Sequence, residues 1–384
     1  MLRHRFLVFC LSCAWVTCPL IAQSVDVVQL ETPEARFAEA FSRIAGLREL
    51  PDGRVLVSDM LEVAVRLVDF ARGTMADVGR QGSGPGEYGM PGALFAARGD
   101  TTYLLDMGNR RFLRLTAGGV VGEAVTMDRA ARGLVLIPRA IDAGGRVYVD
   151  LSGLLMRGME NYAASGRAPL LRLDPHSGAG DTVAYLQFAP LVPRDAAMPP
   201  GEVRVTMGPS KPYEARDAWA VDSDGRVAVV RAEPYRVEWY LPDGTSVVGP
   251  AVRYQPVRIG RAEKEAWVER MGQGIAVVVE NGVRRTMRPP KPDIESLEWP
   301  EAMPPFDGAP VVAPWGEVWV RRSRPARERR AVYDVFDGRA RLVRQVVFPD
   351  GRRLIGFGQR SVYAVHVDAD DLQWLERYPR PEHR

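Results

Sequence analysis

The sequence predicts an all-β protein in which six four-stranded antiparallel sheets stand around a common axis. Three observations support this prediction. Short runs of alternating apolar residues recur along the chain, a tight-turn signal precedes each run, and the intervals between runs suit one small sheet each. Such a closed ring of sheets is a six-bladed β-propeller, and each sheet is one blade.

The most regular elements are six runs that each follow a turn: RVLV from residue 54, TYLL from 102, RVYV from 146, RVAV from 226, EVWV from 317 and SVYA from 361. Turns such as LPDG at 50–53 and DSDG at 222–225 favour hairpins, because glycine accepts positive φ at little cost. A further alternating strand follows each run, as in AVRLVDF at 64–70, and a third closes most units. With the strand before each turn, we expect four strands in each unit.

The spacing of the runs sets the number of blades. Three of the five intervals are 44 or 48 residues, and four-stranded blades repeat at about 40–50 residues. The two longer intervals hold a proline-rich segment at 190–217 and an insertion at 258–307 with one expected helix, RAEKEAWVERMG. Six blades in a single domain, residues 25–380, are therefore predicted.

The last unit lacks a fourth strand before the chain ends. The segment VDVVQLE at 25–31 has alternating apolar residues and no local partner. A ring of sheets is protected only if its first and last blades join. We therefore expect this N-terminal strand to complete the final blade.

Residues 1–24 have the pattern of a secretory signal peptide, a basic start followed by an apolar run and small residues. We therefore expect an exported protein, periplasmic or extracellular. The alternative is a lipoprotein signal modified at Cys18, although Trp15-Val16-Thr17 matches its usual small-residue pattern poorly. All three cysteines lie in this segment, so the mature chain has no disulfide and no thiolate metal site.

Charge and composition limit the partners. Arginine provides 48 of the 51 basic residues, and the formal net charge is only +3, so we expect no nucleic-acid partner. The basic segment RRSRPARERR at 321–330 is interpreted as a solvated loop. No run after residue 24 approaches the roughly 18 apolar residues of a membrane helix, and we expect a monomer.

The glycine-rich stretch GRQGSGPGEYGMPG at 79–92 separates the first two units. A phosphate-binding loop needs Lys and Ser or Thr after its last glycine, or a helix that begins there. Glu87 follows Gly86, no lysine is near, and a strand comes next. We therefore expect a spacer between blades, with Asp106 and Asn109 bonding backbone N–H groups beside it.

This stretch, followed by YLLDMGNRRF at 103–112, resembles the linker and strand pair of NHL-repeat-like and TolB-like propellers, a bacterial six-bladed β-propeller family. Tyr88 stands where the family usually has Phe, and Phe112 where it has Ile. The resemblance implies the propeller fold. For function it implies several classes, because related propellers include binding scaffolds as well as lactonases and lyases.

In a blade the connections alternate between the two ends of the strands, and every long segment here belongs to one end, which we call the long-loop face. Loops on a rigid scaffold commonly carry function. We expect the ligand-binding residues near the channel mouth on this face: Arg110, Arg139, Tyr213, Arg231, Tyr235 and Arg321. Arginine binds anionic groups in a bidentate manner, and tyrosine offers stacking surface. Pairing of these arginines with acids of neighbouring blades is the structural alternative.

Two functional hypotheses follow. The first is an exported, non-catalytic scaffold that binds a protein or an anionic small molecule; it is favoured because only His176 and His366 lie in the body of the domain and no nucleophile motif is present. We expect no cofactor and no zinc site. The alternative, implied by the resemblance, is a calcium-dependent hydrolase or lyase of the lactonase kind. Its channel-side acids would be Glu49, Asp142, Asp217 and Asp222.

Overall fold

The computed structural model describes residues 25–120, 122–126, 138–152, 162, 165–190, 211–272 and 290–381, with the backbone of four short strands at 154–155, 204–205, 276–280 and 283–287. The predicted signal peptide at 1–24, with Cys18, lies outside the described residues. No helix among the described residues is long and apolar enough to cross a bilayer.

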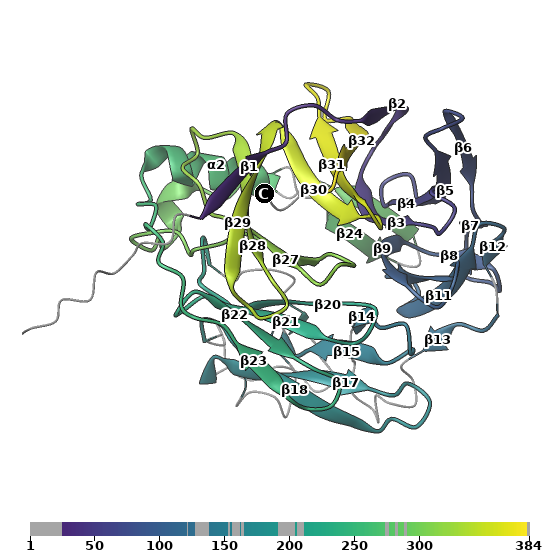
Figure 1. Ribbon diagram of the computed structural model, residues 1–384, viewed down its shortest axis with the longest axis horizontal. Coiled ribbons are helices and arrows are strands. Elements are labelled where there is room, and N and C mark those ends of the chain that lie inside the picture. Colours follow the sequence, from purple (N-terminus) through teal and green to yellow (C-terminus); the bar gives the residue numbers. More distant parts are fainter. Residues whose placement is uncertain are drawn as a thin grey trace, which may run out of the picture.

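The chain folds as a six-bladed β-propeller, as predicted. Its sheets stand around a common centre in Figure 1, and each blade runs outward from an inner strand. Blade 1 contains β3 (Ile44–Glu49), β4 (Val55–Asp59), β5 (Ala64–Asp69) and β6 (Thr74–Asp77). Blade 2 contains β9 (Pro91–Ala96), β10 (Thr102–Asp106), β11 (Arg111–Thr116) and β12 (Gly119–Val120), and β13 (Val125–Thr126) also pairs with β11.

Blades 3 and 4 each have four strands. Blade 3 contains β14 (Pro138–Ile141), β15 (Val147–Asp150), β17 (Arg167–Leu173) and β18 (Gly180–Gln187). Blade 4 contains β20 (Ala218–Val221), β21 (Val227–Arg231), β22 (Arg236–Tyr240) and β23 (Ser246–Val248). All six predicted runs are therefore the second strands of blades, since the last two, at 317 and 361, become β27 (Val318–Arg321) and β31 (Ser361–Val367).

Blades 5 and 6 both receive a strand from the N-terminus. Blade 5 contains β26 (Val311–Val312), β27, β28 (Arg330–Phe336) and β29 (Leu342–Asp350), and β1 (Asp26–Gln29) adds a fifth strand parallel to β29. Blade 6 contains β30 (Arg352–Phe357), β31 and β32 (Gln373–Pro379), and β2 (Ala35–Phe41) pairs antiparallel with β32 as its fourth strand.

The N-terminal chain thus closes the ring, but the predicted closing strand is wrong. Residues 25–31 contain β1, which extends blade 5, and the strand that completes blade 6 is β2. The physical reason is burial. Phe37 and Phe41 of β2 are 2% and 0% exposed in the core between blades 6 and 1, whereas Val27 of β1 is 52% exposed.

The remaining elements lie outside the blades. The expected helix at 261–272 is confirmed as α2 (Arg261–Gly272), followed by β24 (Ala276–Glu280), β25 (Val283–Met287) and the short 3₁₀ helix η1 (Ile294–Ser296). Two further strand pairs are β7 (Arg80–Gln81) with β8 (Glu87–Tyr88), and β16 (Leu154–Leu155) with β19 (Arg204–Val205).

The glycine-rich stretch is a spacer between blades, as predicted. No helix begins at Glu87, which starts β8, and β8 pairs in parallel with β7. Gly79 and Gly86 have φ of 73° and 79°, a conformation that favours glycine. The Tyr88 side chain is 1% exposed, and its hydroxyl donates to the Val78 carbonyl oxygen at 3.2 Å. The stretch therefore anchors blade 1 to blade 2.

Asp106 organises the connection beside this spacer. Its Oδ1 accepts from the backbone N–H groups of Gly89, Met90 and Asn109, at 2.9, 3.1 and 3.2 Å. The side-chain amide of Asn109 donates to Asp106 Oδ2 at 2.7 Å and to the Gly82 carbonyl oxygen at 3.2 Å. The structural role expected for both residues is confirmed.

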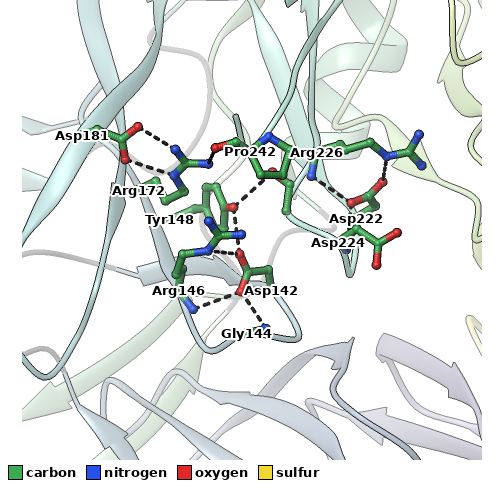
Figure 2. A network of polar contacts seen from close by, with 11 residues as sticks. Asp142, Gly144, Arg146, Tyr148, Arg172, Asp181, Asp222, Asp224, Arg226 and Pro242 are labelled. Atoms are coloured by element: carbon green, nitrogen blue, oxygen red, sulfur yellow. Dashed lines mark hydrogen bonds and ion pairs between the residues drawn. The ribbon is translucent and has the colours of Figure 1, made fainter. Parts of the chain in front are cut away.

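Polar contacts join neighbouring blades at the opposite, short-turn face (Figure 2). Asp142, after β14, accepts from the side chains of Arg146 at 2.8 Å and Tyr148 at 3.1 Å. Tyr148 also reaches the Gly225 carbonyl oxygen in the corresponding turn of blade 4, at 3.4 Å. In the corresponding turn of blade 4, Asp222 likewise accepts from the side chain of Arg226, at 2.6 Å. These short turns therefore hold neighbouring blades together.

Candidate functional site

A cavity of about 1490 Å³ follows the axis of the propeller. The inner strands of all six blades line it, through residues 45–49, 93–96, 139–141, 218–222, 311–314 and 355–359. At the long-loop face its wall continues into the insertion through Trp267 and Arg270 and into the 321–330 loop. Since both the channel and the long segments meet here, this mouth is the candidate site.

The insertion and the segment before β20 bring aromatic side chains to the mouth. Tyr213 and Trp267 line the cavity, and Trp299 packs against both rings, with centroid separations of 6.2 and 5.7 Å. The Tyr213 hydroxyl donates to the Glu263 carbonyl oxygen at 2.7 Å, and the Arg270 guanidinium lies 5.9 Å from the Tyr213 ring. These contacts hold helix α2 beside the channel.

The structure brings three of the six predicted ligand-binding residues to the cavity. Arg139 on β14, Tyr213 before β20 and Arg321 at the end of β27 line its wall. Arg110, Arg231 and Tyr235 do not line it. Arg110 is exposed in the turn between β10 and β11, with a φ of 51°.

Arg231 is held by acids of its own blade. Its guanidinium forms ion pairs with Asp217 at 2.7 Å and Glu238 at 2.6 Å, and also donates to the Tyr240 hydroxyl at 2.9 Å. Burial alone would lower the pKa of Arg231, but these two carboxylates raise it above its ordinary value. Arg231 therefore has a structural role, although its acid partners belong to its own blade and not to a neighbouring blade as the structural alternative expected, and it is not part of the site.

Tyr235 also has a structural position. Its side chain is 2% exposed between blades 4 and 5, and its hydroxyl donates to Asp334 Oδ2 at 2.8 Å. Burial raises the pKa of Tyr235 well above its ordinary value, and the Asp334 charge adds to this effect. Arg322, next to Arg321, ion-pairs with the same carboxylate at 3.1 Å and is directed inward.

Sequence reasoning named only one member, Arg321, of a group of three arginines at the mouth. Arg321 ends β27 of blade 5, Arg353 lies at the start of β30 of blade 6, and Arg43 lies between β2 and β3, where the chain enters blade 1. Burial lowers the pKa of Arg353, and the like charges of Arg43 and Arg321 lower it further. We call these three residues the mouth arginines.

Little negative charge compensates the mouth arginines. The Arg353 guanidinium donates to the Ile44 carbonyl oxygen at 3.4 Å and to Gln373 Oε1 at 3.1 Å, both neutral groups. Among the described residues no carboxylate forms an ion pair with Arg43 or Arg353. Asp307 lies 3.9 Å from Arg321 but is closer to Arg270, at 2.7 Å. A buried or half-buried positive charge without an acid partner is costly, and this identifies the mouth as a place where an anion would be stabilised.

The channel-side acids named for calcium are dispersed. Glu49, Asp142 and Asp222 lie at the short-turn end of three different blades, and Asp217 lies at the long-loop end. Each is already bonded, for example Glu49 to the Tyr363 hydroxyl at 2.6 Å. Within the described part of the chain, no three His, Cys, Asp or Glu side chains are grouped as metal ligands. His176 and His366 do not line the cavity.

No protein-family model matches the chain, and no curated protein matches its sequence. Solved propellers resemble it at low identity. Regucalcin of Agrobacterium tumefaciens, a calcium-binding protein, has 10% identity and a TM-score of 0.43, over 94% of this chain and 99% of its own. A putative gluconolactonase has 14% identity and a TM-score of 0.43, over 92% and 96%.

A putative exported protein of Bacteroides fragilis has 11% identity and a TM-score of 0.47, over 92% of this chain and 94% of its own. These similarities concern the fold and assign no function. The chain is a six-bladed β-propeller, and its narrower resemblance to NHL-repeat-like and TolB-like propellers stays a prediction.

Proposed function

We propose that this protein is an exported binding protein that holds a small anionic ligand at the long-loop mouth of its channel. The observation that carries the proposal is the sparsely compensated charge of the mouth arginines beside a cavity of about 1490 Å³. Arg321 lines the cavity and contacts the ligand, while Arg353 and Arg43 supply positive potential next to it. Tyr213 and Trp267 offer ring faces to the rest of the ligand.

A carboxylate is the simplest group that suits this mouth. A guanidinium binds it through two parallel N–H donors, and a hydrogen bond to a charged group contributes about 1.5–3 kcal/mol. The described residues offer no group of three metal-ligating side chains. We propose the binding protein because the mouth arginines favour an anionic ligand, and the calcium-dependent, lactonase-like enzyme stays the alternative.

The test is calorimetric titration of the protein with citrate at low ionic strength. We expect Arg321→Gln to weaken citrate binding by about tenfold or more, which corresponds to about 1.4 kcal/mol. Arg110→Gln removes one exposed positive charge outside the cavity and is the matched control. We expect less than about a twofold change for this control, since screening reduces distant charges. Equal affinities for the wild type and Arg321→Gln would overturn the proposal.

A second variant separates binding from stability. Arg43→Gln removes a charge that repels Arg353 and has no acid partner among the described residues. We therefore expect it to raise the free energy of unfolding slightly, by up to about 0.5 kcal/mol, and to weaken citrate binding at the same time. If Arg43 had only a structural role, replacing it would lower the free energy of unfolding. A variant that is more stable but binds citrate more weakly therefore indicates that Arg43 serves binding. Loss of stability in Arg43→Gln would contradict it.

A further inference from the structure

A second cavity, of about 700 Å³, lies on the long-loop face outside the channel. Its walls come from three segments: residues 255–258, the first turn of α2, and the loop at 322–328. We call it the arginine cleft. The loop at 322–325 lines both cavities, so the cleft lies behind the wall of the channel mouth.

Positive charge dominates the lining of the arginine cleft. Two carboxylates, Glu263 and Glu328, face five guanidinium groups: Arg258, Arg261, Arg322, Arg324 and Arg327. The basic loop interpreted from sequence as merely solvated supplies three of these arginines. It therefore contributes to a concave surface together with a separate part of the chain.

Several of these charges already have partners. Arg322 is directed to the buried Asp334 at 3.1 Å, Arg324 pairs with Glu328, and Arg261 pairs with Glu265 at 2.7 Å. Arg258 and Arg327 are exposed, and neither forms an ion pair with any described residue. These two guanidinium groups are free to bind a ligand.

Glu263 offsets only part of the positive charge of the cleft, and its carboxylate is held in place by backbone N–H groups. Oε2 accepts from the Gly260 N–H at 3.0 Å, and Oε1 accepts from the Ala326 N–H at 3.2 Å. Burial alone would raise the pKa of Glu263, but these N–H groups and the nearby charge of Arg327 keep it below its ordinary value. The bond to Ala326 ties the 322–328 loop to α2, so the shape of the cleft is held before a ligand arrives.

We propose that the arginine cleft is a second anion site that binds a phosphate group, with Arg258 and Arg327 as its main ligand-binding residues. Guanidinium groups reach the cleft from separate segments, and a tetrahedral phosphate accepts hydrogen bonds from several directions, whereas a carboxylate accepts in one plane. The cavity exceeds a single phosphate, so the group belongs to a larger molecule, either a soluble phosphate ester or a phospholipid headgroup.

The test is calorimetric titration with pyrophosphate in an Arg321→Gln background, which impairs the channel mouth and leaves the cleft intact. We expect pyrophosphate to bind this background protein. Adding Arg258→Gln and Arg327→Gln should weaken that binding by about tenfold or more. Arg98→Gln in the same background removes one exposed charge on the short-turn face, and we expect it to change the affinity less than about twofold.

The outcomes separate this site from the channel mouth. Absence of pyrophosphate binding in the background, or equal binding after the two cleft substitutions, would overturn the cleft proposal and leave the citrate result untouched. Co-sedimentation with phosphatidylcholine vesicles that contain phosphatidic acid identifies the source of the phosphate. Sedimentation that the cleft substitutions abolish supports a lipid headgroup, and pyrophosphate binding without sedimentation supports a soluble ester.

Discussion

Because β2 closes the ring, we expect the substitution of Phe41 to lower the free energy of unfolding by an amount that can be estimated from its burial. Its side chain is fully buried between blades 6 and 1, packed in a cluster with Ile44, Leu47 and Tyr363. Phe37, on the same strand, lies with its ring centroid 6.4 Å from that of Phe41. Phe41→Ala therefore removes the contact that joins the N-terminal strand to the first blade.

The expected cost follows from the cavity that this substitution leaves. Replacing a buried Phe by Ala lowers the free energy of unfolding by about 3–5 kcal/mol, a large share of the roughly 5–15 kcal/mol that stabilises a typical domain. Urea unfolding followed by tryptophan fluorescence measures the change.

Val27→Ala is the matched control. Val27 lies on β1, which only extends blade 5, and it is 52% exposed. We expect this change to cost less than about 0.5 kcal/mol. If Phe41→Ala unfolds like the wild type, or if Val27→Ala costs as much as Phe41→Ala, β2 does not close the ring.

Two further predictions concern residues outside the proposed sites. Tyr235→Phe removes the hydroxyl that donates to the buried Asp334, so we expect it to lower the free energy of unfolding by about 1.5–3 kcal/mol. We expect citrate binding to stay unchanged. Weakened citrate binding would show that Tyr235 belongs to the site. Burial and the charge of Arg352 lower the pKa of His366, whose Nδ1 has no hydrogen-bond partner among the described residues, so its neutral form is favoured on folding. Stability is then lost as pH falls through and below about 6.5. Melting curves at pH 7.5 and 5 should show a smaller loss of stability for His366→Gln than for the wild type. Equal losses would contradict a lowered pKa of His366.

The blades could be predicted from sequence because they depend on local patterns. Alternation and turn residues lie within a few positions of each other, as in RVLV after LPDG. The closing strand could not be identified in this way. The segment ARFAEAF of β2 is rich in alanine and charge and has low β-propensity, so its strand conformation depends on tertiary burial of Phe37 and Phe41. VDVVQLE has the better local pattern, yet it pairs at an exposed edge.

The site could be predicted only in part for a related reason. Blade topology places Arg139, Tyr213 and Arg321 correctly at the channel. It does not reveal partners from other blades, such as Asp334 for Tyr235, which are 99 positions apart. Arg43 and Arg353 come together only because β2 closes the ring, so no spacing in the sequence could associate them.

We propose that the sparsely compensated arginines at the long-loop mouth hold an anion. A crystal structure of the protein soaked with citrate tests it most directly. We expect a citrate carboxylate bound to the Arg321 guanidinium at this mouth, within electrostatic range of Arg353. A mouth without citrate, in crystals where the ligand reaches the channel freely, would contradict it.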